Sequence, residues 1–100
     1  MTKEDVLRSI ETAHLYSFSP APSQAEMQII NRLIAKIDAA IGFINREGAQ
    51  IDPCHMSAEE YELVVQYTEW LLLPGENRGV MPRSLRYGLN NLIFGGGGHV

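Results

Sequence analysis

Hydrophobic residues recur every three or four positions along most of the chain, which is the spacing of one face of an α-helix. The longest such pattern lies between Ser23, which stands three residues before Glu26 as in a capping box, and Gly48, which supplies a left-handed stop. Its main stripe contains Met27, Ile30, Leu33, Ile34, Ile37, Ala40, Ile41 and Ile44. The pattern predicts a helix of roughly 24 residues, about 36 Å long, at the centre of a small bundle.

Two residues of this long helix, Ile29 and Phe43, lie off the main stripe. A helix with apolar residues on more than one side favours a second contact, either within the fold or with another subunit. A shorter helix is predicted before it. That helix begins at Thr2, with Asp5 three residues later, and ends near Tyr16, before a connector with two prolines at 19–22.

A third helix begins after a loop over 49–56, where Ser57 and Glu60 repeat the capping-box spacing. One apolar stripe along it contains Tyr61, Val64, Val65, Thr68, Leu71 and Leu72. A second stripe contains Leu63, Tyr67 and Trp70. Two apolar faces require two neighbours, so the second stripe is covered either within the fold or by another subunit, where aromatic residues are enriched.

A fourth helix begins at Pro82, after a break rich in turn-forming residues. Gly88 inside this helix indicates close packing of its backbone against a neighbour. Its apolar side contains Leu85, Leu89, Leu92 and Ile93. No stretch of the chain alternates apolar and polar residues as a half-buried strand does. The sequence therefore predicts an all-α fold of about four helices in one domain, residues 1–94, followed by a flexible glycine-rich tail, residues 95–100.

Length and composition agree with one soluble domain. The chain has 100 residues, of which 45% are hydrophobic, enough for a core without metal or disulfide staples. No apolar stretch reaches the roughly 20 residues of a membrane span, and the acidic start does not resemble a secretory signal. Cys54 is the only cysteine, which excludes an internal disulfide and fits a reducing compartment. We therefore expect a cytoplasmic protein with no membrane partner.

The chemistry-bearing residues are not arranged as a catalytic, metal or cofactor site. Cys54 lies directly beside His55, but adjacent residues seldom face each other as a nucleophile and its base. The glycine run has no Lys-Ser/Thr after it, so it is not a phosphate loop. The three histidines, His14, His55 and His99, lie in separate segments and lack the spacing of a zinc site. Two acidic pairs, Glu4/Asp5 and Glu59/Glu60, occupy the predicted first turns of helices, where the helix dipole favours negative charge. We expect no enzyme, no metal and no cofactor.

The formal net charge of −4 argues against a domain that grips nucleic acid through its phosphates. Basic residues nevertheless gather near the C-terminus, at Arg78, Arg83 and Arg86. This cluster has three interpretations: a solvated helix face, a protein contact or a local phosphate contact.

The second half of the chain resembles the head–tail connector proteins of tailed phages, the head-completion or adaptor family. The resemblance rests on the stretch Tyr61-Glu-Leu-Val-Val-Gln-Tyr-Thr-Glu-Trp-Leu-Leu of the third helix, the polar break after it, and the segment Met81-Pro-Arg-Ser-Leu-Arg-Tyr-Gly-Leu-Asn-Asn. The long helix after Ser23 resembles the long helix of that family, so the likeness spans about residues 3–94. It is most specific over 61–94, and the glycine-rich end departs from the family pattern.

The resemblance implies a structural role. Such a subunit would assemble with copies of itself as a ring beneath the portal protein, in the virion neck, next to other head-completion or tail proteins. DNA would pass through the ring without sequence-specific binding, and an acidic wall suits this because it repels phosphate. The resemblance gives a candidate contact role to the last helix, with Arg83, Arg86, Asn90 and Asn91. The candidate interface therefore consists of Leu63, Tyr67, Trp70, Arg83, Arg86, Asn90 and Asn91.

Two other classes of function compete with this interpretation. A small helical adaptor or regulatory module would recognise a peptide or another helix through the Leu63/Tyr67/Trp70 face. A gene neighbourhood without portal, capsid or tail genes would favour it. A nucleic-acid-binding regulator would place Arg83 and Arg86 on a recognition helix, and strongly salt-dependent DNA binding would favour that class.

Overall fold

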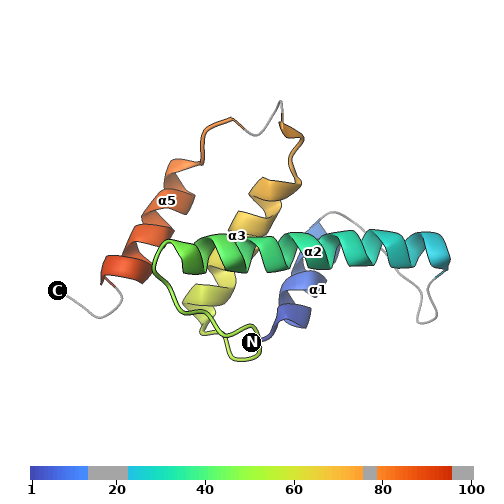
Figure 1. Ribbon diagram of the computed structural model, residues 1–100, viewed down its shortest axis with the longest axis horizontal. Coiled ribbons are helices and arrows are strands. Elements are labelled where there is room, and N and C mark those ends of the chain that lie inside the picture. Colours follow the sequence, from blue (N-terminus) through green and yellow to red (C-terminus); the bar gives the residue numbers. More distant parts are fainter. Residues whose placement is uncertain (14–22, 76–78, 96–100) are drawn as a thin grey trace.

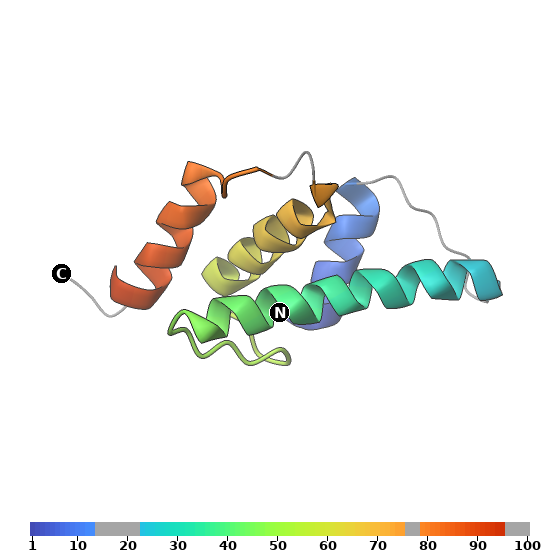
Figure 2. The same ribbon diagram turned by 45° about the horizontal axis from the view of Figure 1, so that its top comes forward.

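The structure, a computed structural model, describes residues 1–13, 23–75 and 79–95. This part of the chain is helical and contains no strand, which confirms the predicted all-α class. Its elements are α1 (Lys3–Ala13), α2 (Gln24–Arg46), α3 (Ala58–Leu72), α5 (Arg83–Asn90) and a π-helical turn, η1 (Asn91–Gly95), that continues α5. In Figures 1 and 2, α3 lies between α1 and α5, and α2 crosses over α1 and α3.

Both predicted capping boxes are present. The Ser23 hydroxyl accepts a hydrogen bond from the Glu26 backbone N–H at 3.2 Å, and the Glu26 carboxylate accepts one from the Ser23 N–H at 3.0 Å. Ser57 and Glu60 make the same reciprocal pair, at 3.1 and 2.9 Å. Each box satisfies two backbone donors that a helix start otherwise leaves without partners, which is why the starts of α2 and α3 are readable from the sequence.

The long helix α2 is packed along only part of its length. Its buried residues are Leu33, Ile37, Ala40, Ile41 and Ile44. None of residues 24–32 is buried, and this projecting segment extends beyond α1 and α3 (Figures 1 and 2). Gly48 follows the helix with φ of 128°, as predicted for its stop. The packed segment, residues 33–46, therefore belongs to the core, whereas the projecting segment is largely solvated.

α3 is the helix that contacts each of the other three, α1, α2 and α5. Its buried residues come from both predicted stripes: Leu63, Val64, Tyr67, Thr68 and Leu71. The Thr68 side chain is fully buried, and its hydroxyl donates to the Val64 carbonyl at 2.7 Å, so burial leaves no unsatisfied hydroxyl. The two apolar faces of α3 thus find their neighbours within the fold, on α2, α1 and α5.

Gly88 brings α5 close to α3, as its position inside the helix predicts. A Cβ atom added at Gly88 would lie 2.9 Å from Leu63 Cδ1, too close for an ordinary carbon contact. α5 begins at Arg83, one residue later than predicted, because Pro82 has an extended ψ of 145° and acts as the N-cap. Leu85 and Leu89 are the buried residues of this helix.

The N-terminus is joined to the loop between α2 and α3 by backbone hydrogen bonds that no sequence pattern announces. Met56 N–H donates to Met1 O at 2.8 Å, and Lys3 N–H donates to Pro53 O at 2.9 Å. The Asn45 side chain fixes the same loop, since its amide accepts from Ile51 N–H at 2.8 Å and donates to Ile51 O at 3.3 Å. These bonds hold the buried Ile51 and Met56 against the core.

The predicted end of the first helix near Tyr16, the proline connector at 19–22 and the tail after Gly95 lie outside the described residues. The start of that helix lies within them. The Asp5 carboxylate accepts from the Thr2 N–H at 2.8 Å, which supports the predicted pairing of these two residues at the helix start.

Candidate protein-interaction surface

The structure divides the seven candidate interface residues between the core and the surface. Leu63 and Tyr67 are buried, with 4% and 6% of their surface exposed, so they do not offer a free face to a partner. Trp70 is half-buried, and Arg83, Arg86, Asn90 and Asn91 are exposed on α5 and at the start of η1. The expected Leu63/Tyr67/Trp70 face is therefore reduced to the edge of Trp70, because α2 and α5 cover the other two residues.

Tyr67 lies in an aromatic cluster that joins α2 to α3. Its ring stacks on Phe43 with centroids 6.1 Å apart, and Trp70 meets it edge-on at 5.7 Å. Burial, with a further contribution from the Glu47 carboxylate, raises the pKa of the Tyr67 hydroxyl above its ordinary value. Such a buried, neutral phenol contributes to packing within the fold.

Arg86 forms an ion pair with Glu47, at the end of α2. The Nη1–Oε1 distance is 2.9 Å, and the second guanidinium nitrogen lies 3.5 Å from the other carboxylate oxygen. Hydrogen bonding to Glu47 raises the pKa of Arg86 and keeps the pair charged. The pair offsets the Arg86 charge, so Arg83 is the free cation of the predicted cluster among the described residues.

The outward face of the last helix forms a continuous stripe that the candidate list only partly contains. Its members are Arg83, Tyr87, Asn90 and Phe94, spaced by four, three and four residues. Tyr87 is 64% exposed and Phe94 is 80% exposed, whereas the opposite side holds the buried Leu85 and Leu89. This outer stripe of α5 thus combines two solvent-exposed rings and an arginine, residue types enriched where proteins meet, with the Asn90 amide.

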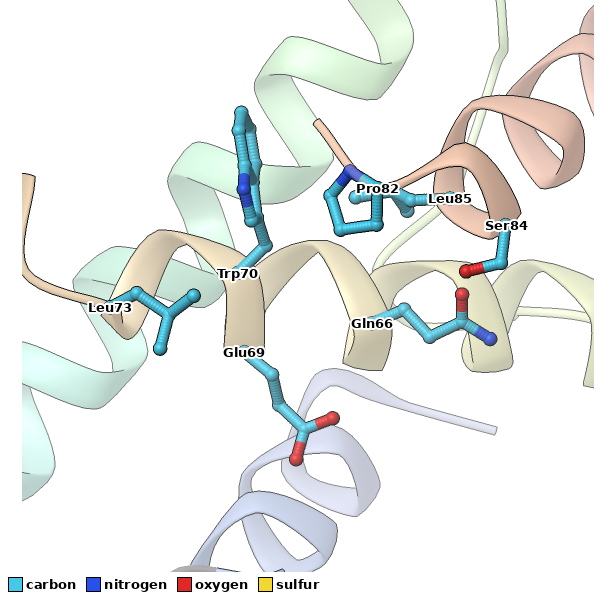
Figure 3. A pocket seen from close by; sticks show the side chains of 7 residues that line it. All are labelled: Gln66, Glu69, Trp70, Leu73, Pro82, Ser84 and Leu85. Carbon is cyan, nitrogen blue, oxygen red and sulfur yellow. The ribbon is translucent and has the colours of Figure 1, made fainter. Parts of the chain in front are cut away.

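A groove runs between α3 and α5. One part, of about 390 Å³, is bordered by Trp70, Leu73, Pro82 and Leu85, with Gln66, Glu69 and Ser84 at its margin. Figure 3 shows the ends of Gln66 and Ser84 facing each other across it, while Glu69 points toward α1. The adjoining part, of about 310 Å³, shares Gln66 and Ser84 and is bordered by Glu59, Glu62 and Asn91. The α3/α5 groove is therefore apolar at the C-terminal end of α3 and acidic at its N-terminal end.

Sequence reasoning missed Tyr87, Phe94 and Leu73 as surface residues. Tyr87 and Phe94 share a face with Arg83 and Asn90 once the helix is drawn from Pro82, so helical spacing could have identified them. Leu73 follows the last turn of α3 and is 45% exposed. Its exposure depends on where α5 packs, and no spacing within one segment reports that.

The Cys54-His55 pair is exposed and lies on a turn rather than in a cleft. The Asp52 carboxylate accepts from the Cys54 N–H at 2.9 Å and lies 3.3 Å from His55 Nδ1. The hydrogen bond from the Cys54 N–H lowers the pKa of Asp52, and the contact with His55 lowers it further. The carboxylate thus shapes the turn between α2 and α3, and its contacts are those of a loop cap.

Within residues 1–13, 23–75 and 79–95, no group of three or more His, Cys, Asp or Glu side chains is arranged to hold a metal ion. No described helix has the length and hydropathy required to cross a membrane. Comparison of the sequence with models of protein families and with curated proteins finds no match, and comparison with solved structures finds none either.

Proposed function

We propose that this chain is a structural subunit of the head–tail connector of a tailed phage or prophage. In this role it assembles as a ring under the portal and extends the channel through which DNA passes. The resemblance over residues 61–94 motivates the proposal, and this range contains most of α3, all of α5 and most of η1.

The exposed outer stripe of α5 is the observation that carries the proposal. A surface phenylalanine that is 80% exposed leaves unused the roughly 1.5–3 kcal/mol that burial of such a side chain provides. Tyr87 and Phe94 both lie on the stripe, beside Arg83 and Asn90, so the face has the composition of a protein interface. An assembly protein has a use for such a face, because its partners cover it in the finished particle.

A ring requires two different patches on each subunit, since every copy contacts one neighbour on each side. The molecule is elongated, 49 Å along its longest axis, and exposed apolar residues occur toward both ends of that axis. Met27 and Ile29 lie on the projecting segment, at one end, whereas Tyr87 and Phe94 lie on α5 and η1, at the other end (Figure 1). This distribution supports head-to-tail contacts better than a single self-complementary patch.

The net charge supports a passive DNA channel. With a net charge of −4, the protein lacks the basic excess that retains nucleic acid through its phosphates. Arg86, one of the few cations near the C-terminus, is also paired with Glu47. A wall of this kind lets DNA slide, and a ring with a continuous basic lining would contradict the proposal.

The test combines light scattering over a roughly hundredfold concentration range with negative-stain electron microscopy of the concentrated protein. Closed rings of many subunits, in the wild type or after co-expression with the portal protein of the same genome, are the expected result. The double variant Tyr87→Ala/Phe94→Ala should lose ring formation or portal binding, while Val80→Ala, which also removes an exposed apolar side chain, should not. A wild-type protein that forms no ring in either setting would contradict the proposal.

A second candidate function is a helical adaptor that binds a peptide or helix of another protein. The α3/α5 groove favours it, since an apolar channel between two helices accepts the apolar face of a third. In that case a foreign protein occupies the groove, and no ring forms.

A further inference from the structure

We infer that the α3/α5 groove of one copy receives the projecting segment of α2 from a second copy, with the two helices antiparallel. The inference deepens the proposed function, because it names the contact between neighbouring subunits. This contact requires the chain to associate with itself, and it does not involve the portal protein.

The groove side of this contact is a single strip along α3 and the residue after it, exposed except at Glu69, which is half-buried at the margin of the groove. Residues 59, 62, 66, 69 and 73 follow one another at helical spacing and face away from the buried side of the helix. Glu59, Glu62 and Glu69 make no ion pair within the described part of the chain, and Leu73 ends the strip as a largely exposed apolar residue. From its N-terminal to its C-terminal end, the strip is acidic or polar as far as Glu69 and ends at the apolar Leu73, next to the apolar lining of the groove.

The projecting segment of α2 has the complementary order. Ala25, Ile29, Arg32 and Lys36 share one side of the helix, and Ile29 is 37% exposed. Lys36 lies one turn beyond Arg32, in the packed segment, and is half-buried. Arg32 and Lys36 make no ion pair among the described residues. From its N-terminal to its C-terminal end, this side is first apolar and then basic, which is the reverse of the strip on α3.

The two orders match when the helices run antiparallel. Ile29 then lies against Leu73, and Lys36 against Gln66, because seven residues separate each pair along its own helix, about 10.5 Å in both cases. Arg32 falls between them, within reach of Glu69, and the long Lys36 side chain reaches Glu62. Opposite charges meet at each step, and apolar side chains meet at the open end of the groove beside Pro82.

Charge exchange between copies tests this register. Arg32→Glu and Glu69→Arg each place like charges against each other, so each should weaken self-association at least tenfold in sedimentation or light scattering up to about 1 mM. An equimolar mixture of the two variants should associate to within about threefold of the wild type, since every contact in an alternating assembly again pairs opposite charges.

Control variants separate this contact from general effects of charge and from misfolding. Glu4→Arg makes the same charge change on an exposed acid of α1 and should leave association unchanged. Glu62→Arg, which faces Lys36 in this register, should weaken association as Glu69→Arg does. If Glu69→Arg shows a lowered unfolding midpoint, Glu62→Arg replaces it and is mixed with Lys36→Glu instead of Arg32→Glu. Mixtures that fail to recover, or single variants that associate like the wild type, would overturn the inference.

The outcomes also distinguish the inference from the proposed function. Rings that are indifferent to Arg32→Glu and Glu69→Arg would leave the connector role standing and remove this contact. Recovery in the mixture without ring formation would retain the contact and remove the connector role. A wild-type chain that stays monomeric at about 1 mM would overturn the inference and leave the groove to a foreign helix.

Discussion

The two parts of α2 have similar sequences but different surroundings. The packed segment holds Leu33, Ile37, Ala40, Ile41 and Ile44 against α1 and α3, and three of these side chains are completely buried. The projecting segment continues the same stripe with Met27 and Ile30, yet Met27 is 40% exposed and Ile30 is only half-buried. Ile29, which lies off the stripe, is 37% exposed. Helical periodicity therefore identifies which residues share a face, but the packing of other elements decides whether that face is covered.

The largest expected effect comes from shortening one isoleucine side chain in each segment. Ile37→Ala should lower the free energy of unfolding by about 2–5 kcal/mol, because it deletes buried methyl groups and leaves a cavity. Ile29→Ala makes the same chemical change at an exposed position and should alter it by no more than about 0.5 kcal/mol. Urea unfolding followed by circular dichroism measures both. Equal losses would mean that the projecting segment is packed in the free subunit.

A second test concerns the polar side chains that accompany each segment. Asn45→Ala removes both hydrogen bonds to the Ile51 backbone and should cost about 1–3 kcal/mol, since Ile51 is buried and its N–H loses its partner. Asn31→Ala, at an exposed position of the projecting segment, is the matched control and should be nearly neutral. The same urea titrations suffice. A neutral Asn45→Ala would show that water replaces the amide.

The two capping boxes provide a finer comparison, because they are chemically identical but begin different helices. Ser57→Ala should cost about 0.5–2 kcal/mol, since the start of α3 is coupled to the core through Leu63 and Val64. Ser23→Ala should cost less in global unfolding, because the projecting segment can fray without exposing buried residues. Its effect should instead appear as faster amide hydrogen exchange over residues 24–32. Equal global losses would contradict the independence of this segment.

The parts of the fold that depend on residues close together in the sequence could be predicted from it. Ser23 with Glu26 and Ser57 with Glu60 specify helix starts through local hydrogen bonds, and Gly88 signals a close approach through its missing side chain. The partner at that approach, Leu63, could not be predicted, because it lies on another helix. For the same reason the sequence left two interpretations of the second stripe of α3, and only the placement of α2 and α5 distinguishes them.

The candidate surface shows the same limit. The predicted contact residues Arg83 and Asn90 are exposed on α5 and Asn91 is exposed at the start of η1, whereas Leu63 and Tyr67 of the same candidate set are buried. The error has a physical cause: a residue that is apolar and off the main stripe suits an internal neighbour as well as it suits a partner protein. Tyr87 and Phe94 were the more informative residues, because they lie on the polar side of an amphipathic helix.

The smallest expected effect comes from acid acting on the loop that closes the packed end of α2. Hydrogen bonds from Cys54 and His55 hold the pKa of Asp52 below its ordinary value of 3.8. A carboxylate with a lowered folded-state pKa stabilises the native state above the ordinary pKa, and this contribution is lost as pH falls through the folded-state value. Asp52→Asn should therefore have a slightly lower urea midpoint than the wild type near pH 6, and this difference should become smaller toward pH 2. Glu62→Gln, which removes an exposed acid without such hydrogen bonds, is the control and should leave the pH profile as in the wild type. If Asp52→Asn and the wild type lose stability in parallel over the whole range, the Asp52 carboxylate contributes nothing to the stability of the packed end of α2, and the difference between the two ends rests on apolar burial and the Asn45 hydrogen bonds.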